Sequence, residues 1–204
     1  MIALEGLADV IQFPPAQAIY VMDKRFCCYC GSPTEIRIPD GDHLPRRICP
    51  ACAAVHYENP RIVVGCVPEA DDGRILICLR AIEPRRGWWT VPAGFMENGE
   101  TLRAGAAREC HEEALAQVDV GELLAVVDIP EAHQVHVFFR AKLTSAVFGA
   151  GPESLDAKLV QPGEIPWEEL AFPSTRFALE SFMQDRETGT TLPHQTTLAR
   201  RYPG

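Results

Sequence analysis

The residues that decide the fold lie in the stretch Gly94-Phe-Met-Glu-Asn-Gly-Glu100-Thr-Leu-Arg-Ala-Gly-Ala-Ala-Arg108-Glu109-Cys-His-Glu112-Glu113-Ala-Leu115. Its alanine-rich second half favours a helix, and Thr101 is of the residue type that caps a helix N-terminus. We therefore expect a helix over residues 101–115. Because an α-helix has about 3.6 residues per turn, Glu109, Glu112 and Glu113 project from one face, at positions i, i+3 and i+4.

A neighbouring stripe of the same helix is apolar and can pack on a sheet; it consists of Leu102, Ala106, Cys110 and Ala114. The three carboxylates beside this stripe repel one another unless a cation lies among them. Mg²⁺ and Mn²⁺ are hard cations that take oxygen ligands. The simpler interpretation is a solvated acidic face, which three glutamates at this spacing alone would favour. The presence of Gly94, Glu100 and Arg108 at fixed spacings favours a metal site over a solvated acidic face.

The complete pattern resembles the Nudix box: Gly94, five residues, Glu100, seven residues, Arg108-Glu109, two residues and Glu112-Glu113. The segment Trp89-Thr-Val-Pro-Ala-Gly94 directly before it strengthens the resemblance. In that family the box is a loop-helix-loop that binds a catalytic divalent metal and hydrolyses a nucleoside diphosphate linked to another moiety. The resemblance therefore implies a pyrophosphatase. One position departs from the family pattern, because Leu115 stands where the family usually has glycine.

The acidic helix face supplies the expected ligands for the catalytic Mg²⁺ or Mn²⁺. These are Glu109, Glu112 and Glu113, and the i, i+4 spacing of Glu109 and Glu113 points those two the same way. The resemblance implies a further ligand from the backbone carbonyl of Ala93 or Gly94.

Two further parts of the catalytic site are predicted outside these ligands. Glu100 and Arg108 are expected to form an ion pair that holds the loop against the helix and so orients the ligands. The family often contributes another acid from a later loop, as a base or a metal ligand. Residues 151–156 contain the candidates: Asp156 takes this place if the following segment matches the family's strand and turn, and Glu153 is the rival.

Candidate substrate-binding residues lie just before the box. Trp88 is a candidate for stacking on a nucleobase, whereas Trp89 fits equally well as a core residue under the loop. Arg80, with Arg85 and Arg86, is a candidate for contact with phosphate, although a surface position is the commoner state of arginine.

Four of the eight cysteines form two C-x-x-C motifs, Cys27 with Cys30 and Cys49 with Cys52. Their spacing is typical of a zinc ribbon in which four thiolates hold structural Zn²⁺. Cys28 is the one thiol that could be confused with Cys27. We prefer Cys27, because Cys-x-x-Cys-Gly gives the tight turn in which backbone amides can donate to the thiolates.

Composition and charge narrow the possible partners and the compartment. The net charge of −9 argues against broad nucleic-acid binding, which needs a basic surface. No apolar run reaches the length of a membrane span, and the first residues lack the basic start of a signal peptide. We therefore expect a cytoplasmic protein that does not enter membranes and acts on a small molecule of the dinucleotide type.

The pattern along the chain predicts a loosely ordered lead-in at residues 1–24, a zinc ribbon at 25–56 with its turn at 39–42, a Nudix hydrolase domain at 57–187 and an irregular tail at 188–204. Predicted strands cover residues 61–67, 74–80, 122–129 and 134–143, and a second helix begins at Ser174 or Thr175 and ends before Gly189. The expected fold class is α/β: a Nudix α/β/α sandwich with a mixed sheet, preceded by a small β zinc ribbon.

The substrate class rests on further resemblance, which extends over roughly residues 26–187. Four segments look like plant FAD and ADP-ribose pyrophosphatases: Phe26-Cys-Cys-Tyr-Cys-Gly31, His56-Tyr-Glu-Asn-Pro60, Thr90-Val-Pro-Ala-Gly-Phe95 and Gly151-Pro-Glu-Ser-Leu155. Such enzymes split FAD into FMN and AMP, or ADP-ribose into AMP and ribose 5-phosphate. NADH pyrophosphatases also carry a zinc ribbon, but their Ser-Gln-Pro-Trp motif is absent from this chain.

Two other functions remain as alternatives. One is a non-catalytic Nudix-like module that senses a nucleotide, which the complete acid set disfavours. The other is an RNA 5′-end pyrophosphohydrolase, which the acidic charge disfavours. A homodimer is common in the family, so the resemblance implies that one is possible here, but the sequence does not define the oligomeric state.

Overall fold

The computed structural model describes residues 24–198. The chain divides into two compact units between Asn59 and Pro60. All but the last residue of the predicted lead-in, residues 1–24, lies outside the described part of the chain.

The first unit is a three-stranded antiparallel sheet. Its strands, in spatial order, are β1 (Glu35–Arg37), β2 (Arg46–Ile48) and β3 (Val55–His56). Between β1 and β2 the backbone N–H of Asp42 donates to the carbonyl of Pro39 at 3.0 Å, which confirms the predicted turn. The small sheet next to a cysteine cluster agrees with the predicted zinc ribbon.

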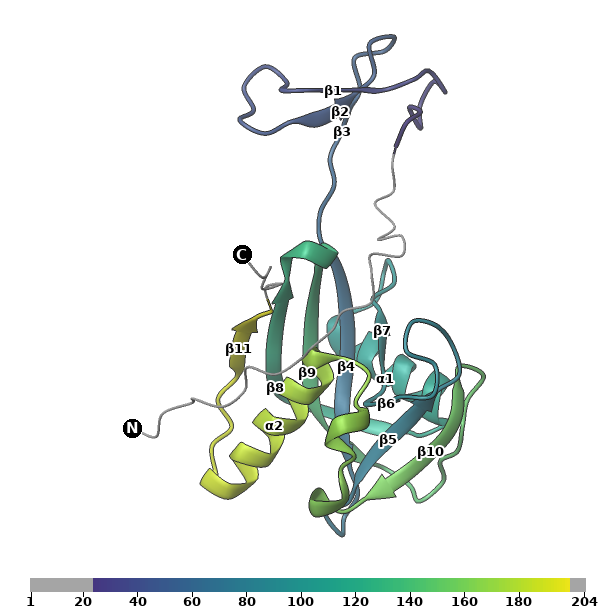
Figure 1. The fold of residues 1–204 in the computed structure, drawn as a ribbon, viewed down its shortest axis with the longest axis vertical. Coiled ribbons are helices and arrows are strands. Elements are labelled where there is room, and N and C mark those ends of the chain that lie inside the picture. The colour runs from purple at the N-terminus through teal and green to yellow at the C-terminus, as the bar shows by residue number, and fades with distance from the viewer. Residues whose placement is uncertain (1–23, 199–204) are drawn as a thin grey trace. The chain divides into compact units, whose positions relative to one another are not determined.

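The second unit is built on an eight-stranded sheet (Figure 1). Its spatial order is β10-β5-β4-β9-β8-β11, with β6 paired to β5 and β7 paired to β4. The pairs β4–β9 and β8–β11 are parallel and the others antiparallel, so the sheet is mixed as predicted. The strands are β4 (Arg61–Glu69), β5 (Ile75–Arg80), β6 (Trp89–Thr90), β7 (Ala93–Phe95), β8 (Val118–Ile129), β9 (Gln134–Leu143), β10 (Ser154–Val160) and β11 (His194–Thr197).

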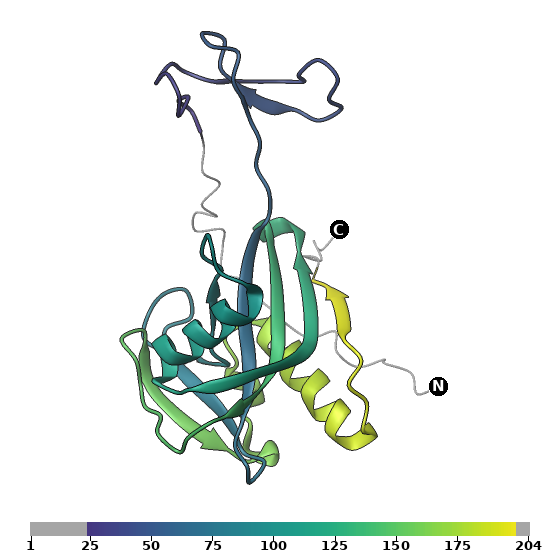
Figure 2. The ribbon, with the colours of Figure 1, turned by 180° about the vertical axis from the view of Figure 1, so that it is seen from behind.

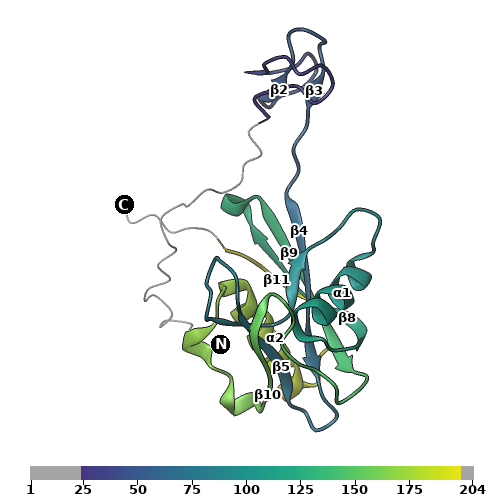
Figure 3. The same ribbon diagram turned by 90° about the vertical axis from the view of Figure 1, so that its right-hand side faces the viewer.

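Two helices cover the two faces of this sheet: α1 (Leu102–Ala114) and α2 (Pro173–Thr188). α2 lies in front of the sheet in Figure 1 and α1 lies in front in the reverse view of Figure 2; Figure 3 shows them on the two sides of β4. This arrangement confirms the predicted α/β/α sandwich. Three short 3₁₀ turns also occur, η1 (Pro130–Ala132), η2 (Pro162–Glu164) and η3 (Trp167–Glu169).

Local sequence signals account for the N-terminus of each helix and for the C-terminus of α2. The Thr101 hydroxyl accepts from the N–H of Ala104 at 3.2 Å and caps α1 as predicted. α2 begins with Pro173 in its first turn, where a missing N–H costs nothing. It ends at Gly189, which has φ of 70° and is left-handed.

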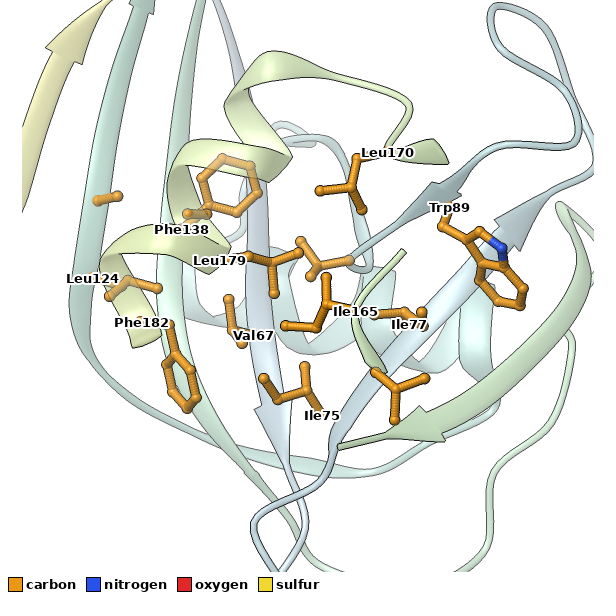
Figure 4. Close-up of a cluster of buried hydrophobic side chains, with 14 of the residues drawn as sticks. Val67, Ile75, Ile77, Trp89, Leu124, Phe138, Ile165, Leu170, Leu179 and Phe182 are labelled. Carbon is orange, nitrogen blue, oxygen red and sulfur yellow. The ribbon is translucent and has the colours of Figure 1, made fainter. Parts of the chain in front are cut away.

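Each helix buries an apolar face against the sheet. The α2 side forms the larger cluster (Figure 4), which includes Val67, Ile75, Phe138, Leu179 and Phe182. On the opposite face, α1 packs through Ala106, Cys110 and Ala114 against Val64 and Cys66 of β4. The predicted apolar stripe of α1 is therefore the surface that fixes the helix, and the acidic face beside it is held in one orientation.

Three predictions about element boundaries were wrong. The tail is not irregular throughout, because His194–Thr197 form β11 in parallel register with β8. β8 begins at Val118, four residues before the predicted start, because it pairs with β9 from Leu143 onwards. α1 was expected to continue or to close with an ordinary turn at Leu115, yet this residue is left-handed, with φ of 50°.

Candidate active site

The acid cluster, defined as Glu109, Glu112 and Glu113, lies on the second half of α1 where the helix passes β7. Glu109 and Glu113 are buried, at 8% and 5% exposure, because this face of α1 packs towards β4 and β7. The side chain of Glu112 is 54% exposed. The helix therefore presents two buried carboxylates and one at the surface, all on one side.

The peptide of Ala93 and Gly94 on β7 lies against both buried carboxylates. The N–H of Ala93 donates to Oε2 of Glu113 at 3.1 Å. A Cβ on Gly94 would lie 2.4 Å from the carboxyl carbon and from both carboxyl oxygens of Glu109. Only glycine therefore lets the Glu109 carboxylate approach this strand. The backbone that the family resemblance singled out as a ligand source is in contact with the acids.

Arg108 connects the acid cluster to the loop before the helix. Its Nε and Nη2 donate to the two oxygens of Glu100 at 3.1 and 2.9 Å, which is the ion pair that the sequence predicts. Nη2 also donates to the carbonyl of Phe95 at 3.1 Å. Nη1 donates to Glu109 at 2.7 Å and to Glu112 at 2.9 Å. One guanidinium thus orients the loop and two of the three acids.

Glu100 stabilises the conformation of this loop. Its Oε1 accepts from the N–H of Glu97 at 2.8 Å. The hydrogen bonds from Arg108, the first cause, and from the Glu97 backbone lower the pKa of Glu100 to about 2. A Cβ on Gly105 would lie 2.6 Å from Glu100 Oε1, so this glycine of α1 makes room for the contact.

Burial has the opposite effect on the two inner acids. Desolvation raises the pKa of Glu113 to about 7, against the hydrogen bond from Ala93 and with a further rise from the charge of Glu109. Desolvation also raises the pKa of Glu109, although Arg108 opposes it. A buried carboxylate is costly without a compensating charge. This site therefore holds negative charge that the protein compensates only in part.

The residues present fit a divalent metal. The donor set is carboxylate and backbone oxygen, which Mg²⁺ and Mn²⁺ prefer over softer ligands. Because burial disfavours the charged forms of Glu109 and Glu113, a cation near them would offset that cost. Glu109, Glu112, Glu113 and the Ala93 or Gly94 carbonyl are the groups that would hold it.

The two later acids lie in different surroundings. Glu153 precedes β10, and its charge raises the pKa values of Glu109 and Glu113. Asp156 lies within β10, beyond a register shift, and its Oδ1 accepts from the N–H of Ala157 at 2.8 Å. Both side chains are exposed. The N–H of Gly151 donates to the carbonyl of Glu113 at 3.0 Å, so the segment that carries Glu153 is attached to α1, which favours Glu153 over the predicted Asp156.

Arg80, at the end of β5, is a buried cation whose charge interacts with that of Glu113. It is 8% exposed, its Nε donates to the carbonyl of Pro84 at 2.9 Å, and its guanidinium lies 5.0 Å from the ring centre of Phe172. Within residues 24–198 it forms no ion pair, and burial lowers its pKa in spite of the nearby charges of Glu113 and Glu153. Such a desolvated guanidinium is suited to an anionic ligand.

Trp88 and Trp89 lie in different surroundings, in agreement with the sequence analysis. Trp89 is buried in the core on the α2 side, with the Lys158 ammonium 4.0 Å from its ring centre. Trp88 is half-buried, and the Arg85 guanidinium lies 4.8 Å from its ring centre. Arg86 is exposed. Arg80 and Trp88 thus remain the two candidates for contact with a substrate.

A second cluster, of thiols, lies in the first unit. The sulfurs of Cys27, Cys30, Cys49 and Cys52 all lie within 4.8 Å of one another, which is the arrangement of a four-thiolate metal site. Backbone and side-chain hydrogen bonds from Ser32 lower the pKa of Cys30 to about 6. The sulfur of Cys28 is instead 3.8 Å from Nδ1 of His56. The choice of Cys27 over Cys28 agrees with this geometry.

No role was predicted from the sequence for Gly151 itself or for Phe172. A Cβ on Gly151 would lie 1.7 Å from the carbonyl oxygen of Glu112, so two backbones meet there. The run Gly149-Ala-Gly-Pro152 indicates a turn, but no local signal shows which helix the turn contacts. Phe172 gives no local signal either, because it meets Arg80 only through the fold.

Comparison with known proteins agrees with this arrangement. Residues 59–181 match the family model described as the NUDIX domain, and residues 25–58 match the one described as Nudix N-terminal. A crystal structure of a NUDIX hydrolase from Nitrosomonas europaea is 47% identical, covers 85% of this chain and 99% of that chain, and superposes with a TM-score of 0.80.

Two curated relatives have assigned activities. The NAD-capped RNA hydrolase NudC of Stutzerimonas stutzeri (strain A1501) is 27% identical over 168 residues, which are 82% of this chain and 59% of that protein. The ADP-ribose pyrophosphatase of Methanocaldococcus jannaschii is 29% identical over 120 residues, which are 57% of this chain and 69% of that protein. The chain therefore spans about three fifths of the length of the NudC relative.

Proposed function

Because the chain belongs to the Nudix family, we propose that it hydrolyses the pyrophosphate bond of a nucleoside diphosphate derivative in a reaction that depends on Mg²⁺ or Mn²⁺. The observation that carries this proposal is the pair of buried carboxylates, Glu109 and Glu113, held against the Ala93–Gly94 peptide, together with the buried Arg80, which forms no ion pair within residues 24–198. A sensor without catalysis would not need two buried acids with raised pKa values.

The acid cluster, Arg80 and Glu153 are proposed to have different roles in the reaction. Glu109, Glu112 and Glu113 hold the divalent cation, which when bound neutralises the pyrophosphate and lowers the pKa of a water molecule. Arg80 holds a phosphate oxygen as the phosphorus–oxygen bond of the anhydride breaks. Glu153 accepts a proton from the attacking water.

Arg108 and Glu100 are proposed to position the acid cluster and not to contact the substrate. Because Arg108 donates to Glu109, Glu112 and the loop carbonyl of Phe95, it orients the two carboxylates towards the position where a cation would bind.

The proposed substrates are ADP-ribose, giving AMP and ribose 5-phosphate, or FAD, giving FMN and AMP. The relative from Methanocaldococcus jannaschii, which is named as an ADP-ribose pyrophosphatase, supports the first. FAD rests only on the sequence resemblance to plant enzymes. Trp88, half-buried at the end of the loop before β6, is proposed to stack on the base.

A second candidate is hydrolysis of the NAD-type cap at an RNA 5′ end. The NudC relative favours it. The net charge of −9 argues against broad binding of nucleic acid, but it does not argue against recognition of a single RNA 5′ end. The absent Ser-Gln-Pro-Trp motif argues the other way.

The experiment is a substrate panel of ADP-ribose, FAD, NADH, coenzyme A and NAD-capped RNA with Mg²⁺ or Mn²⁺, with AMP or the uncapped 5′ end as the product measured. Release of AMP from ADP-ribose above all other substrates supports the proposal. Cleavage of the capped RNA alone selects the second candidate. Metal-dependent binding of ADP-ribose without cleavage of any substrate selects the sensing module and contradicts hydrolysis.

Two further proposals concern the state of the protein. The four-thiolate cluster is proposed to hold structural Zn²⁺, supported by the mutual distances of the sulfurs. None of the eight cysteines, which all lie in the described part of the chain, forms a disulfide, which supports the proposed cytoplasmic location, where thiols stay reduced. Within residues 24–198 no helix is long and apolar enough to span a membrane. The homodimer stays a prediction.

A further inference from the structure

The segment Gly151–Glu153 is attached to the last turn of α1 by its backbone. The N–H of Gly151 donates to the carbonyl of Glu113 at 3.0 Å. A Cβ on Gly151 would lie 1.7 Å from the carbonyl oxygen of Glu112 and 2.8 Å from its carbonyl carbon. These atoms belong to a helix backbone, which cannot move aside as a flexible side chain could. Glycine is therefore required for the contact, although the φ of Gly151 is not in the left-handed region.

The same segment is attached to β5 at its other end. The N–H of Ala81 donates to the carbonyl of Glu153 at 2.8 Å, and the N–H of Ser154 closes a turn on the carbonyl of Gly151 at 3.0 Å. Ala81 directly follows Arg80, and Glu113 is the buried acid of α1. Gly151–Glu153 therefore bridges the helix that carries the acid cluster and the strand that ends in the buried arginine.

We propose that Gly151 is a positioning residue, whose backbone contact with α1 fixes the segment so that the Glu153 carboxylate reaches the acid cluster. The proposal rests on the proposed function, because it assigns Glu153 as the acid that takes the proton from water. Glu153 is exposed and has no hydrogen bond of its own to α1 within residues 24–198, so its position depends on this backbone.

The test is a cycle of four proteins: wild type, Gly151→Ala, Glu153→Gln and the double variant, assayed on the best substrate of the panel. We expect Gly151→Ala to lower kcat by about tenfold or more while KM changes less than about threefold. In the Glu153→Gln background the same substitution should have no further effect on kcat, because the group it positions is gone. Gly149→Ala is the matched control: its Cβ would make an ordinary 3.9 Å contact with Leu115, and kcat should stay within about twofold of wild type.

Each outcome decides the proposal. A loss of kcat that is equal in both backgrounds would mean that Gly151→Ala merely disturbs α1, and wild-type kcat in Gly151→Ala would overturn the contact's role. If Gly151→Ala does not fold by circular dichroism, Pro152→Gly loosens the link between Gly151 and Glu153 and leaves the helix contact intact. It should lower kcat by about threefold, and only when Glu153 is present; unchanged kcat overturns the proposal. A wild-type protein inert on the whole panel would instead overturn the proposed function.

Discussion

The carboxylate of Glu109 occupies the space that a side chain on Gly94 would need, since a Cβ there would lie 2.4 Å from the carboxyl atoms. The displaced atoms are the far end of a flexible side chain, so Gly94→Ala should fold normally. The substitution should move Glu109 away from the metal position and lower kcat by roughly 10²-fold or more, or about 2.7 kcal/mol. Thermal unfolding and kcat measured side by side check this. A variant that keeps full activity would show that the contact is unimportant.

Glu113→Gln should abolish metal-dependent hydrolysis and leave the fold intact. The amide oxygen can still accept from the N–H of Ala93 but cannot supply the charge of a ligand. We expect kcat to fall roughly 10²–10⁴-fold. Activity within a few-fold of wild type would remove Glu113 from the site.

The same variant should change how stability depends on pH when no divalent metal is added. Burial raises the pKa of Glu113 from 4.5 to about 7, so the folded state retains its proton where the unfolded state has lost it. The contribution of Glu113 to the free energy of unfolding should therefore be greatest below pH 4.5 and fall by up to about 3 kcal/mol as the pH rises through 7. The free energy of unfolding of Glu113→Gln minus that of wild type should grow between pH 5 and 7.5. A difference that is flat with pH contradicts this.

Leu115 adopts a left-handed conformation at the end of α1, with φ of 50°. A side chain costs roughly 1–2 kcal/mol in this region, whereas glycine adopts it freely. Leu115→Gly should therefore raise the free energy of unfolding by about 1 kcal/mol. Leu115→Ala retains a Cβ and should give no such gain. Hydrolysis should change less than about tenfold in both variants, because the acids lie upstream on a helix fixed by its apolar face.

The thiol cluster predicts a clear difference between two cysteine variants. Cys49→Ser should release the bound zinc, because Cys49 is fully buried with its sulfur 3.4 Å from that of Cys30. Cys28→Ser should retain one zinc per chain, since the Cys28 sulfur lies beside His56. Elemental analysis of the two purified variants measures this, and the reverse ranking would show that Cys28 is the ligand.

The later acid can be identified by a pair of variants. Glu153→Gln should lower kcat by about 10²-fold, whereas Asp156→Asn should leave it within about threefold of wild type. Kinetics on a single substrate suffice. A larger loss in Asp156→Asn would restore the assignment that the sequence favoured.

Local chemistry explains what the sequence could predict. The spacing of Glu109, Glu112 and Glu113 depends only on helix geometry, and the Thr101 cap lies three residues from its partner. β9 was predicted with its correct ends, Gln134 and Leu143, because one face alternates apolar residues throughout.

Features that depend on distant contacts were not predictable. The approach of Gly151 to Glu112 joins residues 39 positions apart in backbone-to-backbone contact, which no composition pattern encodes. The choice between Glu153 and Asp156 depends on the register shift at the start of β10. β11 was missed because its polar residues form a strand only when β8 is present to pair with it.

The parallel pairing of β4 with β9 sets an order for assembly during synthesis. β4 lies at the centre of the sheet under α1, yet its register with β9 runs from the pair Arg61 and Gln134 onwards. The helix α1, which carries the acid cluster, is therefore synthesised well before β9, the strand that completes the sheet surface on which α1 packs. Contacts so distant along the chain slow folding, because a long loop must close first. Until β9 is synthesised, the apolar side of α1 lacks the β9 residues Val137, Phe139 and Ala141 that complete its core cluster, and exposed apolar surface of this kind favours aggregation.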